Sequence, residues 1–220
     1  MSKSKKQQLK DRSNLFKFES VTIKDEEMDD GWLKPNKVHL VTIISFIIFE
    51  LMLVLSHFAG TEYTTAQFIS LSVVALILAR QIALDFAYHI LLEIYNIPLI
   101  IMSIFIPSLV FDQGTITQSV IAGFGMFGFF LVFTLIASWL KGQLAGIGGG
   151  DILFAFAIGG FLQGFLIFIS MFLSSMLSLV LTFFYKDKQN VPMGPGLLIS
   201  FWLCLLYNEQ IIDLLNQYLG

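Results

Sequence analysis

Long apolar runs dominate this chain and limit the folds that it can adopt. The sequence has 220 residues, of which 56% are hydrophobic and only 13% are charged, a balance far from that of a soluble domain. Several of the runs approach the roughly 20 apolar residues that a helix needs to cross a bilayer. We therefore predict an all-α, polytopic membrane helix bundle.

The apolar runs divide into about seven predicted transmembrane helices. The run from Asp151 to Tyr185 is too long for one span at ~1.5 Å per residue, so we predict a break at Gln163-Gly164. The predicted helices are His39–Phe58, Gln67 to beyond Asp85, Pro98 to before Asp112, Ile116–Leu140, Asp151 to about Phe161, Phe165–Tyr185 and Pro195–Tyr207.

Three regions follow from this division. Residues 1–37 are a polar tail, predicted to be mostly disordered because it lacks a sustained apolar period. Residues 38–208 form the predicted membrane domain, and residues 209–220 form a short C-terminal tail. No cleavable signal peptide is predicted, because the first apolar run begins only near His39.

The positive charges predict the orientation of the chain. Nine of the thirteen Lys and Arg residues lie in the N-terminal tail, and Lys141, Lys186 and Lys188 lie in loops that seven spans would place on the same side. The loops on the opposite side carry only acidic charges. By the positive-inside rule we expect a multi-pass plasma-membrane protein with a cytoplasmic N-terminus and an external C-terminus.

A glycine-rich stretch, Gly148-Gly149-Gly150-Asp151, opens the fifth predicted helix. Carboxylates at the mouth of a membrane helix are costly and often functional. Glycines allow crowded or left-handed backbone, so another backbone can approach the carboxylate closely. Two interpretations remain for this stretch alone: a functional acid, or a glycine helix cap beside an Asp that marks the membrane border.

A second acid favours the functional interpretation. Asp85 lies near the cytoplasmic end of the second predicted helix, so the predicted topology brings Asp85 and Asp151 to one membrane face at similar depth. Two close carboxylates share a proton and titrate in two steps. One can then act as a base toward water and the other as an acid, which is aspartic-protease chemistry. The alternative is a pair of unrelated interfacial acids.

These residues resemble motifs of the type IV prepilin leader peptidases, which are membrane aspartic proteases of the GxGD kind. Three blocks stand in the family's order: Asp85 with Asn96-Ile97-Pro98 for the first aspartate and an LTLP-like stretch, Gly148-Gly149-Gly150-Asp151 for GxGD, and Pro192-Met193-Gly194-Pro195 for a PFGP-like block. The resemblance runs from about His39 to Tyr207.

The resemblance implies a prokaryotic endopeptidase, a hydrolase, with its active site at the cytoplasmic membrane face. Its substrate would be a prepilin or pseudopilin with a basic leader peptide, as used in type IV pilus assembly, protein secretion and competence. Asp85 and Asp151 would be catalytic. Residues that would bind or position the substrate are Gly148, Gly149, Gly150, Pro192, Gly194 and Pro195.

The sequence also departs from the family. Larger members carry a cytoplasmic loop with paired CxxC motifs, whereas residues 1–37 contain no cysteine, so the resemblance does not extend to the N-methylation associated with that loop. Basic residues common after the first aspartate are replaced by Phe86, Ala87 and Tyr88, and Leu153 replaces a frequent lysine. Losing these cations removes partners that would keep an aspartate ionised.

No metal or organic cofactor is expected, because the sequence has neither an HExxH motif nor a phosphate-binding GxxxxGK motif. The predicted partners are the leader-bearing substrate and the lipid bilayer, and no nucleic acid is predicted. Two alternatives stay open: a presenilin-like protease that cuts within a helix, and a non-enzymatic transporter whose two aspartates relay ions.

Overall fold

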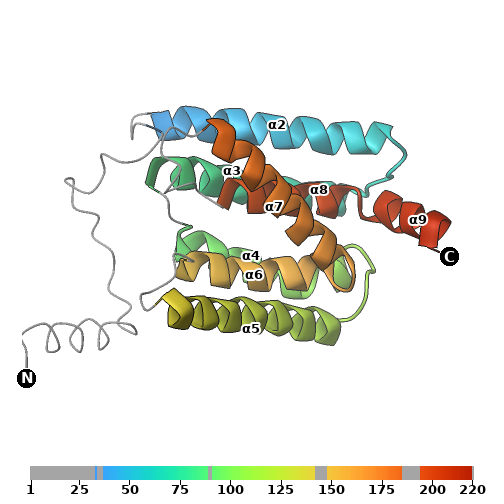
Figure 1. Ribbon diagram of the computed structural model, residues 1–220. Helices are drawn as coiled ribbons and strands as arrows, with labels where there is room; N and C mark the ends of the chain where they lie inside the picture. Colours follow the sequence, from blue (N-terminus) through green and yellow to red (C-terminus); the bar gives the residue numbers. More distant parts are fainter. Residues whose placement is uncertain (1–32, 34–36, 89–90, 142–147, 185–193, 220) are drawn as a thin grey trace, which may run out of the picture. The chain divides into compact units, whose positions relative to one another are not determined.

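The computed structural model describes residues 33, 37–88, 91–141, 148–184 and 194–219. These ranges form eight helices: α2 (Val38–Phe58), α3 (Thr65–Tyr88), α4 (Glu93–Leu109), α5 (Ile116–Lys141), α6 (Gly149–Leu162), α7 (Leu166–Phe184), α8 (Gly194–Leu206) and α9 (Asn208–Leu219) (Figure 1). The described ranges contain no β-strand, which confirms the predicted all-α class.

Four helices, α2, α3, α5 and α7, are long and apolar enough to cross a membrane. Helices α8 and α9 give a fifth if the 77° bend between them is counted as a break within one span. Helix α4 has 17 residues and α6 has 14. At ~1.5 Å per residue α6 is roughly 21 Å long, shorter than a ~30 Å bilayer core. Length and composition thus support four or five spans, whereas the sequence predicted about seven.

The predicted break after the fifth helix is present. Helix α6 ends at Leu162, and the next two residues have left-handed backbone, with φ of 47° at Gln163 and 51° at Gly164. Glycine adopts this conformation without steric cost. Gln163 is held there by its side chain, whose Nε2 donates a hydrogen bond to Oγ of Ser119 on α5 at 2.8 Å. The chain therefore reverses direction between α6 and α7.

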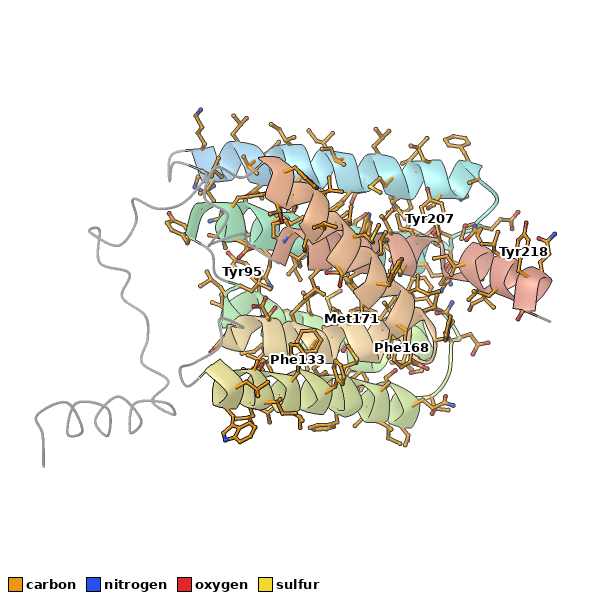
Figure 2. The ribbon with its side chains drawn as sticks, viewed as in Figure 1. Tyr95, Phe133, Phe168, Met171, Tyr207 and Tyr218 are labelled. Carbon is orange, nitrogen blue, oxygen red and sulfur yellow. The ribbon has the colours of Figure 1, made fainter. Side chains whose placement is uncertain are left out.

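The helix ends gather at two opposite ends of the bundle. At one of them, which we call the site end, α3 ends with Tyr88 while α4, α6 and α8 begin with Glu93, Gly149 and Gly194 (left in Figure 1). Figure 2 shows Tyr95 toward this end, and Tyr207 and Tyr218 toward the other. Helices α4 and α6 run in the same direction, so their first turns lie at the same end.

Helix α6 lies in the interior of the bundle. Each residue from Phe154 to Leu162 is buried, as expected for a helix that is apolar on all sides. Phe201 of α8 packs against it, with its ring centroid 5.6 Å from those of Phe154 and Phe161. Helices α4 and α5 cover its other faces.

Glycines on α6 allow these neighbours to approach. A Cβ on Gly159 would meet the backbone carbonyl group of Ala122 on α5, and a Cβ on Gly160 would stand 2.5 Å from Oγ of Ser103 on α4. Small residues at such positions are typical of helix pairs in membranes, because backbones can then come into contact. The helix that begins with the glycine-rich stretch is therefore fixed along its length by close packing.

Helix α9 differs from the predicted short C-terminal tail at residues 209–220. Its apolar residues, such as Ile212 and Leu215, lie on one face of the helix, and the remainder of the helix is polar, with Glu209 and Asp213 among its residues. The first turns are tied to the loops at this end of the bundle, because Gln210 Nε2 donates to Thr61 Oγ1 at 2.7 Å. Its short, weakly apolar sequence gave no membrane-span signal.

The α5–α6 contact generates a stability prediction. Gly159→Ala should lower the free energy of unfolding by ~1–3 kcal/mol, because its methyl group would overlap the Ala122 backbone. Gly125→Ala on α5 is the matched control: no atom of the described residues lies within 4 Å of that position, so stability should be unchanged or rise by up to ~1 kcal/mol. Thermal unfolding of both variants in the same detergent measures this. Equal melting temperatures would contradict the contact.

Candidate functional site

Asp85 lies in the last turn of α3 and is 5% exposed. Its Oδ2 has no hydrogen-bond partner within the described part of the chain. The first residue of α8 lies directly against it: a Cβ on Gly194 would stand 2.5 Å from Oδ2 and 2.8 Å from Cγ. The backbone amide of Gly194 also faces the carboxyl group. Glycine at this position therefore leaves room for the acid.

Asp151 is the third residue of α6, directly after the glycines. Its Oδ2 accepts a hydrogen bond of 3.1 Å from the backbone N–H of Gly148, the residue that caps the helix. This is one half of a capping box, which satisfies a donor that the helix itself leaves free. A carboxylate in the first turn is further stabilised by the helix dipole. Asp151 is only partly buried, so it is more accessible than Asp85.

The two acids come from different helices and meet at the site end. They lie near enough for the charge of Asp151 to act on Asp85. No lysine or arginine forms an ion pair with either acid among the described residues. Two interacting acids without a cation hold a single negative charge more readily than two. Such a pair can accept a proton at one group and donate one from the other.

The three glycines before Asp151 have different surroundings. A Cβ on Gly150 would overlap the backbone carbonyl oxygen of Leu91, so the close backbone approach expected for this stretch occurs at Gly150. No atom of the described residues lies within 4 Å of the corresponding position on Gly149. Gly148 has an ordinary extended backbone, with φ of −69° and ψ of 152°. Only one of the three glycines is thus required by packing.

Leu91 was not singled out from the sequence, yet it lies between two parts of the site. Its carbonyl group contacts Gly150, and its Cδ2 would stand 3.3 Å from a Cβ on Gly194. Leu91 is buried and precedes α4. An apolar residue in a loop has no feature in the sequence that would predict a position beside Gly150 and Gly194. Its role becomes visible only when the first turns of α6 and α8 are brought to the loop that precedes α4.

Of the third motif block, Gly194 and Pro195 are buried at the start of α8, and Gly194 contacts Asp85 as described. Pro192 lies outside the described residues. The structure therefore brings one residue of this block directly to the acid pair.

Two buried amide side chains also reach the site. Asn96 of α4 donates from Nδ2 to the carbonyl oxygen of Gly150 at 2.9 Å, and Gln81 of α3 donates from Nε2 to Asn96 Oδ1 at 2.5 Å. Asn96 belongs to the motif block Asn96-Ile97-Pro98, whereas Gln81 belongs to none of the three blocks. The available signal was a lone amide within an apolar run, one helical turn before Asp85.

Other candidate sites are weaker. The described residues contain no cluster of three or more His, Cys, Asp and Glu side chains that could hold a metal ion. A cavity of about 670 Å³ lies at the opposite end of the bundle, where its lining includes Gln118, Gln163 and Glu209. It touches neither Asp85 nor Asp151, so it does not belong to the acid pair.

No protein-family model, curated protein or solved structure matches this chain. The candidate site therefore depends on its own geometry and on the motif resemblance.

The contact at Gly150 predicts a difference between neighbouring glycines. Gly150→Ala should displace the first turn of α6 from Leu91 and move Asp151 relative to Asp85. A shift of ~1 Å at reacting groups can lower a rate about a hundredfold. Gly149→Ala should retain activity, because its methyl group would meet no atom of the described chain within 4 Å. The leader-cleavage assay implied by the family resemblance measures both variants at matched membrane abundance. Equal activities would mean that the Gly150 contact does not position Asp151.

Proposed function

We propose that this protein is a membrane aspartic endopeptidase that removes the basic leader of prepilin-like proteins. The single observation that carries the proposal is the placement of Asp85 and Asp151 on two helices at one end of an apolar bundle, where Leu91 contacts Gly150, next to Asp151, and lies beside Gly194, which packs against Asp85. The GxGD resemblance supplies the substrate class.

In the proposed mechanism the two acids share one proton and activate one water. Asp151, stabilised by the Gly148 N–H and the helix dipole, is the base. It takes a proton as the water oxygen attacks the scissile carbonyl carbon, while Asp85 gives its proton to the carbonyl oxygen. Asp85 then takes a proton back from the tetrahedral intermediate, and Asp151 protonates the leaving amide nitrogen as the C–N bond breaks. Both acids return to their starting state.

We further propose a cytoplasmic location for the site end in a prokaryotic plasma membrane. Counting the shorter helices α4, α6 and α8 with the four longer ones gives seven membrane segments. The positive-inside rule then puts the N-terminal side of α2, and the acid pair with it, in the cytoplasm. A pilin precursor carries its basic leader on that side, so its cleavage site would meet the acids at the membrane edge.

Replacing either acid tests the mechanism. Asp85→Asn and Asp151→Asn should each lower leader removal by at least ~10²-fold, since each removes one proton-transfer group. The control is Asp213→Asn on the exposed surface of α9, which should cleave at the wild-type rate. The measurement is the fraction of a leader-bearing prepilin processed in reconstituted membranes, at equal protein abundance. Near wild-type cleavage by either site variant would refute the acid pair. An intact leader with the wild-type protein would instead favour an ion-relaying transporter.

Metal chelation is a second test of the proposed mechanism. Cleavage should survive EDTA, because two carboxylates and water complete the proposed step. Loss of cleavage in EDTA with recovery on adding zinc would contradict it.

A further inference from the structure

We infer that Gln81 and Asn96 are positioning residues that fix the distance between the two acids, an inference whose catalytic part rests on the proposed function. Both side chains are fully buried, at 0% exposure. They form a chain of hydrogen bonds from α3 through α4 to the carbonyl oxygen of Gly150 on α6. One end of the chain lies a helical turn before Asp85, and the other end is the residue next to Asp151.

Each hydrogen bond in this series fixes the donor and acceptor of the next one. The carbonyl oxygen of Gly150 can only accept, so Nδ2 of Asn96 must face it and Oδ1 must face away. Oδ1 in turn can only accept, so Nε2 of Gln81 must donate to it. Gln81 therefore supports the orientation of the Asn96 amide that the Gly150 carbonyl oxygen requires. The α3 helix that carries Asp85 is linked in this way to the turn that carries Asp151.

Gly150 is held on two sides by this arrangement. Asn96 binds its carbonyl oxygen, while the backbone of Leu91 presses against its Cα. Both contacts come from the start of α4. The first turn of α6 thus has no freedom to slide along α4 without breaking a buried hydrogen bond or overlapping a backbone.

Burial of the Gln81 side chain has an energetic cost. Its Oε1 is buried and has no hydrogen-bond donor among the described residues. Buried polar atoms without a partner are uncommon, and an apolar residue of similar shape would avoid the cost. The presence of an amide at this position is explained by its hydrogen bond to Asn96. Gln81 and Asp85 are four residues apart, so Oε1 lies on the same face of α3 as the acid.

The test compares Asn96→Leu, Gln81→Leu and the double variant in full-length protein in nanodiscs. Asn96→Leu should lower kcat by about a hundredfold with little change in KM, because the acids are displaced by ~1 Å while the rest of the substrate contacts stay. Gln81→Leu should cause a smaller loss of kcat. The double variant should be no worse than Asn96→Leu, since Gln81 acts only through Asn96. Additive losses, or a change in KM alone, would overturn the inference.

The matched control is Ser103→Ala. Ser103 is also buried on α4, two turns from Asn96, but among the described residues its hydroxyl donates a hydrogen bond only within its own helix, to the carbonyl oxygen of Ile100. Its replacement should leave kcat unchanged. If Asn96→Leu does not accumulate in the membrane, Gln81→Met keeps the shape, removes the donor and tests the same link; wild-type kcat in that variant would overturn it.

Amide hydrogen exchange separates this inference from the proposed function. Asn96→Leu should speed exchange in the peptide that covers Gly148–Ile152, with the rest of the bundle unchanged, whether or not the protein cleaves a leader. An increase spread evenly over all helices would show a general structural role and overturn the positioning role. No increase at the turn would overturn it as well. If wild-type protein cleaves no prepilin, the proposed function fails, and exchange alone decides whether the amide pair holds the turn.

Discussion

The burial of α6 on all sides is the constraint on which the rest of the structure depends. A helix without a polar face must be covered by neighbours, and here α4, α5 and α8 cover it. Close packing of these neighbours requires glycines where backbones touch, at Gly150 near one end of α6 and at Gly159 near the other. The same packing that buries the helix also fixes its first turn. Asp151 is therefore placed by the whole length of α6 and not by a loop alone.

Around that fixed turn, the polar groups of the site divide into two kinds. Asp151 is capped by Gly148 and partly accessible, while Asp85 is buried beside Gly194 with an oxygen that has no hydrogen-bond partner among the residues that the structure describes. Their unequal surroundings suit a pair in which one acid gives and the other takes a proton. The amides behind them are fully buried, so they serve geometry and not contact with a substrate. In the proposed mechanism, proton transfer and positioning would thus fall to separate residues at one end of the bundle.

Much of this arrangement was predictable from local sequence. The apolar runs predicted seven of the eight described helices. The predicted break in the longest run falls at the correct residues, Gln163-Gly164, because the length of a helix and the conformational freedom of glycine are local properties. Helix α9 was missed because its apolar residues are too few for a span. The number of full-length spans was not predictable either, since α4 and α6 are apolar enough for a membrane yet shortened by the turns that flank them.

The sequence by itself determined the all-α class, the apolar helices and the two acids at helix ends, since hydropathy and glycine spacing need no neighbour to be read. Only the tertiary structure decided which atoms surround those acids. Leu91 against Gly150, Gly194 against Asp85, and the bonds from Gln81 through Asn96 all join residues far apart along the chain. Such contacts depend on how helices rotate and slide against one another. That choice is made by close packing of the whole bundle, which no single stretch of sequence specifies.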